Sequence, residues 1–217
     1  MRKTKKIALV CMLIMCMLCG CGARVNASGY LQAILDNGYK NDSKAFVELK
    51  LGTSEEAAQI YQEGIDDEMR ILTAGVGEIS DEYVTKLRQT YTEMLGKVRY
   101  SVKEATKQED GSYVVSVTYE QMNIYGPTME AYEKATTQLY DYWKETGELP
   151  QTQEELTNKV LDLLNESLQG ALENVQYDSS ESTTVTVKMV DGVYTIDEND
   201  LKNLNTVLFD SGEVEEK

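Results

Sequence analysis

Histidine is absent from this chain of 217 residues, and cysteine is confined to its first 21 positions. Without histidine, the Ser-His-Asp and Cys-His mechanisms and histidine-ligated zinc or haem are excluded. The four cysteines are Cys11, Cys16, Cys19 and Cys21, so residues 22–217 form no internal disulfide and offer no thiol. Phenylalanine occurs twice and tryptophan once, against 14 tyrosines, so most of the aromatic surface carries a hydroxyl group.

Positive charge is scarce relative to negative charge. The chain has 21 Lys and Arg against 37 Asp and Glu, a formal net charge of −16. Binding to nucleic acid phosphates needs clustered Lys and Arg, so this balance argues against a nucleic acid partner. With 41% hydrophobic and 27% charged residues, the composition is that of an ordinary globular protein.

The N-terminal segment has the pattern of an export signal. Residues 1–6 carry four positive charges and no acid, and residues 7–18 form an apolar run. A bilayer-spanning helix needs about 20 apolar residues, so this run is too short to span. A charged start followed by a short apolar region is typical of a secretory signal. Two alternatives to a lipoprotein signal remain open: a plain secretory signal, and an uncleaved anchor helix, each with an incidental Cys21.

The end of the apolar run reads Leu18-Cys19-Gly20-Cys21 and resembles the bacterial lipobox. The resemblance implies that Cys21 is linked to diacylglycerol and that cleavage makes it the first residue of the mature chain. Gly20 provides the small residue needed before the cleavage site, whereas Cys16 and Cys19 each follow a bulky residue. Cys19 stands where the motif more often has Ala, Ser, Thr or Val.

We therefore expect a signal peptide over 1–20 and a short tether over 21–29. Removal of the signal leaves 17 basic and 37 acidic residues, a formal charge of −20. The two acyl chains of a diacylglyceryl group bind a membrane firmly. Residues 22–29 extend at most about 27 Å, so the folded part is expected close to the outer face of the bacterial cytoplasmic membrane.

Helical periodicity alternates with strand periodicity after the tether. Capping boxes at 53–56 and 152–155 each mark the start of a helix. Apolar residues recur at intervals of three and four over 30–37, 42–51, 54–73, 80–96, 129–147, 152–175 and 197–208. These seven segments are the expected helices.

Two hairpins are expected between the helices. Apolar and polar residues alternate over 98–103 and 113–119, with an Asp-Gly turn signal at 110–111. The second hairpin comprises 183–190 and 193–196, with Asp-Gly at 191–192. We predict an α+β fold in which helices pack on one face of a roughly four-stranded antiparallel sheet made of the two hairpins.

The body shows no internal linker. We expect a single domain over 30–209, followed by a disordered acidic tail over 210–217. The similar tripeptides at 98–100 and 175–177 each follow a helix and precede a hairpin. An internal duplication is therefore left open.

Three segments, at 30–42, 53–65 and 191–201, resemble a family of Gram-positive lipoproteins of unknown function. They correspond to the opening helix and turn, the acidic second segment, and the closing hairpin and helix of that family, which more often has Trp in place of Tyr194. The resemblance implies a cell-envelope location and a cystatin- or NTF2-like arrangement of sheet and helices. It provides no catalytic residues.

Two acidic clusters are candidate sites. The segment 197–200, Asp-Glu-Asn-Asp, could offer oxygen ligands to Ca²⁺, but it lacks the glycine and the distant glutamate of a calcium loop. We interpret it as a helix N-terminus in which Asp200 caps the helix. The run containing Glu63, Asp66, Asp67 and Glu68 is interpreted as a solvated helix face. We therefore expect no metal and no cofactor.

Tyrosine is the unusual signal. Tyr and Trp often anchor binding surfaces, and our hypothesis is that Tyr125 and Tyr142 line a shallow groove or partner surface. The alternative is that the tyrosines fill the edges of the core while their hydroxyls bond to water or backbone.

Two functions from different classes remain. The first is a non-enzymatic binding or interaction module for an envelope protein or small ligand, whose sign would be a tyrosine-lined pocket between sheet and helices. A scaffolding role at the membrane is a variant of it. The alternative is a carboxylate-dependent hydrolase acting on cell-wall material, whose sign would be two acids meeting in a cleft, one with a raised pKa. We predict the binding module.

Overall fold

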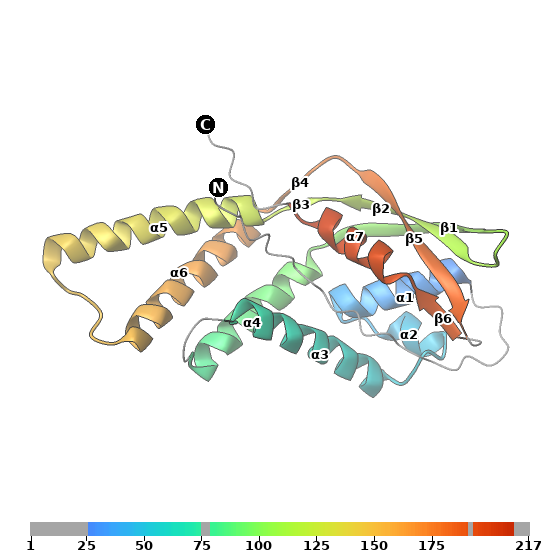
Figure 1. Cartoon of the computed structure of the whole chain (residues 1–217), viewed down its shortest axis with the longest axis horizontal. Helices are drawn as coiled ribbons and strands as arrows, with labels where there is room; N and C mark the ends of the chain where they lie inside the picture. The colour runs from blue at the N-terminus through green and yellow to red at the C-terminus, as the bar shows by residue number, and fades with distance from the viewer. Residues whose placement is uncertain (1–25, 75–78, 191–192, 211–217) are drawn as a thin grey trace. The chain divides into compact units, whose positions relative to one another are not determined.

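The computed structural model describes residues 26–74, 79–190 and 193–210 (Figure 1). Contacts divide the chain into two compact units. Within the described ranges, the first comprises residues in 26–68, 99–119 and 180–208, and the second comprises residues in 69–98, 120–179 and 209–210. Neither unit is a continuous piece of sequence. The single domain expected over 30–209 stays a prediction, and the signal and lipobox lie outside the described residues.

The first unit is built on a four-stranded antiparallel sheet in the order β1-β2-β5-β6. The strands are β1 (Arg99–Lys107), β2 (Tyr113–Glu120), β5 (Glu181–Val190) and β6 (Val193–Ile196). Val115 and Val117 of β2 and Val185 and Val187 of β5 are fully buried, and they alternate with less buried neighbours. One face of the sheet therefore forms the core, as the alternation predicted.

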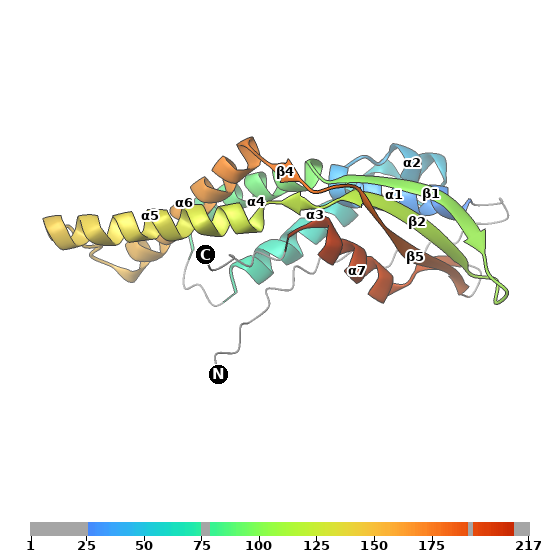
Figure 2. The ribbon, with the colours of Figure 1, turned by 90° about the horizontal axis from the view of Figure 1, so that it is seen from above.

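Helices cover that core face. Helices α1 (Ala27–Lys40) and α7 (Glu198–Leu208) lie against the strands, while α2 (Lys44–Glu48) and the first part of α3 (Ser54–Leu72) pack on α1. In Figure 1, α1 and α7 both lie below β1 and β2, and Figure 2, seen from above, shows α1 along β1 and α7 along β5 toward the other edge. The hydroxyl of Tyr39 on α1 donates a hydrogen bond to Asn205 on α7, which joins the two helices. The predicted α+β arrangement is confirmed.

Strands β2 and β5 are neighbours in the sheet although a long stretch of chain separates them. Their register pairs Tyr113 with Val187 at one end and Tyr119 with Glu181 at the other. The chain therefore leaves the sheet after β2 and returns beside the point where it left. The stretch between them belongs to the second unit.

The second unit is mostly helical. It contains α4 (Asp81–Gly96), α5 (Tyr125–Thr146) and α6 (Gln153–Glu173), together with a two-stranded sheet of β3 (Met122–Asn123) and β4 (Gln176–Tyr177). Strands of two residues are too short for any periodicity, and the sequence did not predict them.

Several predicted helix ends lie elsewhere in the structure: α2 is shorter than the predicted 42–51, α5 begins at Tyr125 rather than at 129, and both ends of α1 differ. Helix α1 begins at Ala27, so the end of the predicted tether is helical. It then continues past Gly38 to Lys40, because Asn41 takes the left-handed conformation at its C-terminus, with φ of 52°. Asparagine tolerates that conformation better than most residues do, so the helix does not need Gly38 as its stop.

Most described tyrosines serve the fold. Tyr30 and Tyr39 are almost completely buried. The hydroxyl of Tyr30 donates to the backbone oxygen of Tyr194 at 2.9 Å, and that of Tyr177 donates to the backbone oxygen of Lys97 at 2.7 Å. These residues fill apolar space and place a hydroxyl on a backbone acceptor, which agrees with the structural interpretation of the tyrosines.

The capping box at the start of α3 is formed in both directions. The Glu56 backbone N–H donates to Thr53 Oγ1 at 3.1 Å, and the Thr53 backbone N–H donates to Glu56 Oε2 at 2.7 Å. We expect Thr53→Ala to lower the free energy of unfolding by about 1 kcal/mol, measured by urea denaturation. Thr53→Ser keeps the acceptor and should retain most of this stability. An equal loss in both variants would show that the cap does not stabilise α3.

Candidate functional site

Helix α5 begins on a carboxylate from the far end of the chain. Asp210 accepts hydrogen bonds from the backbone N–H groups of Ile124, Tyr125 and Gly126, at 2.8, 2.7 and 2.6 Å. A helix start has unpaired N–H groups and a positive dipole end, so a carboxylate there is stabilising. A Cβ on Gly126 would lie 3.1 Å from Asp210 Oδ2, so glycine permits the close approach.

This contact corrects one expectation. Asp210 was expected to begin a disordered tail, but it is bound to the start of α5. Its backbone N–H also donates to the Met122 oxygen at 3.1 Å. Residues 211–217 lie outside the described part of the chain.

Helices α5 and α6 form a hairpin. Gly147, with φ of 74°, ends α5 in the left-handed conformation, and Thr152 Oγ1 caps α6 by accepting the Glu155 N–H at 3.1 Å. Helix α6 also contacts α4, where the Tyr83 hydroxyl donates to Asp162 at 3.1 Å. The caps set the ends of the two helices, and the contact between Tyr83 and Asp162 holds α6 against α4.

A groove with a cavity volume of about 450 Å³ lies between α5 and α6. Cavities of about 300–1,000 Å³ are typical of small-ligand sites. Small and apolar side chains form both walls: Pro127, Ala131 and Ala135 from α5, and Leu163, Ser167, Gly170 and Ala171 from α6. The lining does not include the expected tyrosines, and the groove lies between two helices beside the short strands β3 and β4 rather than between the four-stranded sheet and helices.

Polar groups line the remainder of the groove. They are the amides of Asn123, Asn174 and Gln176 and the carboxylate of Glu166. The segment 125–173, which includes both helices, carries ten acidic and three basic residues, a net charge of −7. The groove therefore has apolar walls, amide groups and an acidic surrounding.

Gly170 is not required by the packing of α6. It lies in the helix interior, and a Cβ built there would have no heavy atom within 4 Å. Glycine in a helix interior is less stable than alanine by about 0.5–1 kcal/mol. We therefore expect Gly170→Ala to raise the free energy of unfolding by about that amount in thermal or urea denaturation. A loss of stability would mean that an undescribed contact requires the glycine.

The two candidate surface tyrosines lie at opposite ends of α5. Tyr125 is in its first turn, with its ring centroid 5.8 Å from that of Phe209. Tyr142 is 17 residues further on, about 25 Å along the helix. Its exposed side chain donates a hydrogen bond to Glu148, which raises the pKa of Tyr142. The structure does not bring the two hydroxyls together, and the surface they were expected to share stays a prediction.

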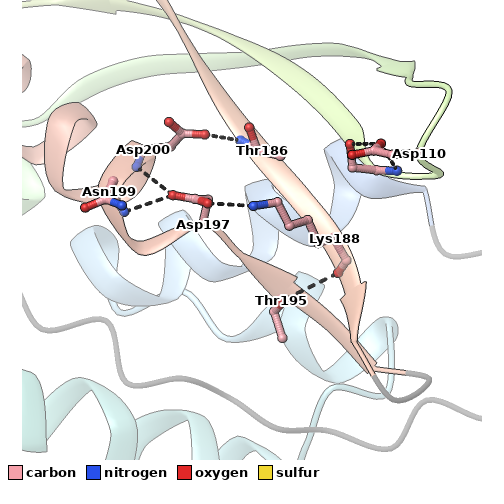
Figure 3. A network of polar contacts seen from close by, with 8 residues as sticks. Asp110, Thr186, Lys188, Thr195, Asp197, Asn199 and Asp200 are labelled. Atoms are coloured by element: carbon pink, nitrogen blue, oxygen red, sulfur yellow. Dashed lines mark hydrogen bonds and ion pairs between the residues drawn. The ribbon is translucent and has the colours of Figure 1, made fainter.

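The acidic segment at 197–200 forms a helix start (Figure 3). Asp197 accepts the backbone N–H groups of Asn199 and Asp200 at 3.1 and 3.4 Å, and its other oxygen accepts Lys188 Nζ at 2.8 Å. The contact with Lys188 lowers the pKa of Asp197. Asp200 instead accepts the Thr186 N–H of β5 at 2.8 Å. The cap of α7 is therefore Asp197, not Asp200 as expected.

Within the described ranges, no group of three or more Asp, Glu, Cys or His residues could hold a metal ion. The acidic run on α3 also differs from its interpretation as a fully solvated face. Glu63 and Asp66 are exposed, but Glu68 is buried, with 2% of its surface accessible. Glu68 follows Tyr61 by seven residues and Ile65 by three, so it lies on the apolar stripe. That spacing was the signal that the sequence analysis missed.

Burial, together with the nearby charge of Asp67, raises the pKa of Glu68 to about 7. Neither carboxylate oxygen has a hydrogen bond to a described residue. Glu68 does not line the groove or the smaller pocket between α4 and α6, whose acids are Glu166 and Asp162 respectively. Neither of these two pockets therefore brings two carboxylates together, as the hydrolase alternative requires.

The fold is similar to that of a candidate lipoprotein, YcdA, from Bacillus subtilis strain 168, known from a crystal structure. The TM-score is 0.57 at 14% sequence identity, and the match covers 85% of this chain and 56% of YcdA. This chain thus matches little more than half of YcdA, and the likeness shows a shared fold. No protein-family model and no curated protein sequence matches the chain. No helix within the described ranges is long and apolar enough to cross a membrane.

Proposed function

We propose that the protein is a lipid-anchored, extracytoplasmic binding protein of the bacterial cell envelope and that the groove between α5 and α6 is its ligand site. The signal pattern and the lipobox-like sequence ending at Cys21 support the anchor. The fold shared with YcdA, itself described as a candidate lipoprotein, agrees with that location. The observation that carries the binding role is the cavity of about 450 Å³ with apolar walls and amide groups.

The anchor is tested by metabolic labelling of the producing bacterium with a radioactive fatty acid. We expect the wild-type chain to be labelled and to sediment with membranes. The Cys21→Ala variant should be unlabelled and should not be held at the membrane by lipid. Equal labelling of both chains would overturn lipidation at Cys21.

The binding site is tested with N-phenyl-1-naphthylamine, a neutral apolar dye that fluoresces when it leaves water. Trp143 is the single tryptophan of the chain and lies on α5. It is eight residues beyond Ala135, about 12 Å along the helix. Dye bound in the groove should therefore accept excitation energy from Trp143, which reports the place of binding as well as its occurrence.

A matched pair of variants separates the groove from the rest of the unit. Gly170→Leu adds a side chain at the groove, whereas Gly96→Leu makes the same change on α4, where a Cβ also has no heavy atom within 4 Å. We expect Gly170→Leu to weaken dye binding at least about tenfold, the effect of 1.4 kcal/mol, and Gly96→Leu to leave it unchanged. Circular dichroism confirms that each variant is folded. Undiminished energy transfer in folded Gly170→Leu would overturn the groove as the site.

A further inference from the structure

We infer that the occupant of the groove is a cationic, amphipathic α-helix of a partner peptide or protein. This inference rests on the proposed function, since it assumes that the groove is the ligand site. It adds the chemical class of the ligand, which follows from the length of the groove, its walls and the charge around it.

The groove has the length of a short helical segment. Its α5 wall extends from Pro127 to Ala135, about 12 Å along the helix, and its α6 side extends from Leu163 to Asn174, about 16 Å. Apolar residues at positions i, i+4 and i+7 of a docked helix span about 10 Å. Three such anchors therefore fit along the walls, and the small residues there leave room for large side chains on the partner.

The charge of the hairpin selects the sign of the partner. The segment 125–173 has a net charge of −7, and Glu166 places a carboxylate on the wall itself. A helix with lysines beside its apolar stripe would place its cations near this acidic surrounding. The amides of Asn123, Asn174 and Gln176 offer hydrogen bonds to polar groups that flank the stripe.

The same charge disfavours other occupants. A second copy of this chain would bring a second hairpin of charge −7 against the first. The C-terminal segment 211–217 carries three acids and one base, so it is also repelled. An anionic bilayer surface is repelled for the same reason.

The test uses two fluorescein-labelled peptides of about 14 residues, a helix of about 21 Å. One has leucines at helical spacing and lysines elsewhere, and the other replaces every lysine by glutamine. Binding is followed by fluorescence anisotropy, and unlabelled peptide competes with the naphthylamine dye. We expect the lysine peptide to displace the dye. At low salt it should bind at least about tenfold more tightly than the glutamine peptide, and this difference in affinity should shrink as added salt screens the charges.

Two glutamate variants locate the charge effect. Glu166→Gln removes the carboxylate of the wall, and Glu154→Gln removes an exposed carboxylate in the first turn of the same helix, outside the groove. Because Glu166 is exposed, we expect Glu166→Gln to weaken the binding of the lysine peptide only about two- to fivefold. The glutamine peptide should bind Glu166→Gln as it binds wild type, and Glu154→Gln should have the smaller effect on the lysine peptide.

The outcomes separate the two proposals. If Gly170→Leu blocks the dye but neither peptide displaces it, the groove remains a ligand site and the helical ligand is wrong. Equal binding of the two peptides, or equal effects of Glu166→Gln and Glu154→Gln, also overturns the cationic partner. If folded Gly170→Leu leaves dye binding unchanged, the proposed site itself fails.

Discussion

Asp210→Ala should lower the free energy of unfolding by about 3 kcal/mol. One carboxylate accepts three backbone N–H groups at the start of α5, and all three lose their partner at once. Hydrogen bonds to charged groups contribute about 1.5–3 kcal/mol each, but water can replace part of this at a half-buried site. The expected loss therefore exceeds that of an ordinary helix cap, which is about 1 kcal/mol.

The measurement is urea denaturation together with hydrogen exchange at the amides of Tyr125 and Gly126. Asp210→Asn keeps one acceptor oxygen and should show a smaller loss. Asp141→Ala removes an exposed carboxylate from α5 away from its start and serves as the control. If Asp210→Ala unfolds at the same urea concentration as Asp141→Ala, the carboxylate does not hold the helix.

Glu68→Met should raise the free energy of unfolding at neutral and alkaline pH. Glu68 is buried, and neither of its oxygens has a hydrogen bond to a described residue. A charge in that position loses its hydration without gaining a partner. Methionine has a similar length and no charge, and it suits the stripe that contains Ile65 and Met69.

The sign of the pH dependence follows from the raised pKa. Below about pH 4.5, Glu68 is protonated in both states, so its charge has no effect on stability. As the pH rises to about 7, the unfolded state ionises first and stability falls, by about 3 kcal/mol in all. Above about pH 7 both states are ionised and the loss is complete. The advantage of Glu68→Met should therefore grow by about 2 kcal/mol between about pH 5.5 and 8.5.

Two variants check this result by thermal and urea denaturation at several pH values. Glu68→Gln keeps the shape but not the charge, and it should remove most of the pH dependence. Glu63→Met changes an exposed glutamate of the same helix and should not stabilise. An advantage of Glu68→Met that is the same at both pH values would contradict the burial of an ionised carboxylate.

The sequence predicted the parts of the fold that depend on local patterns. Alternation gave both hairpins, and the capping boxes gave the starts of α3 and α6, because these signals lie within a few residues of each other. The two-stranded sheet of β3 and β4 was missed because its strands are too short to show a period. The start of α5 could not be attributed to Asp210, since the two are more than 80 residues apart and only the folded chain brings them together.

The candidate site was less predictable than the fold. Tyrosines and acids are conspicuous in a sequence, and the predicted sites consisted of these residues. The groove is lined mostly by residues such as Ala131, Ala135 and Gly170, whose importance is the space they leave, and space between helices has no sequence signature. The burial of Glu68, by contrast, was predictable, because its position on the apolar stripe of α3 follows from residue spacing alone.

The register between β2 and β5 has an evolutionary consequence. Because Tyr119 and Glu181 are partners in the sheet, the chain that carries the groove enters and leaves the first unit at adjacent points. Such a stretch can lengthen, shorten or diverge in sequence without shifting the pairing of β2 with β5. Selection can therefore alter the lining of the groove, the proposed ligand site, while the four-stranded sheet and its helices are inherited unchanged, much as new loops diversify on a constant framework.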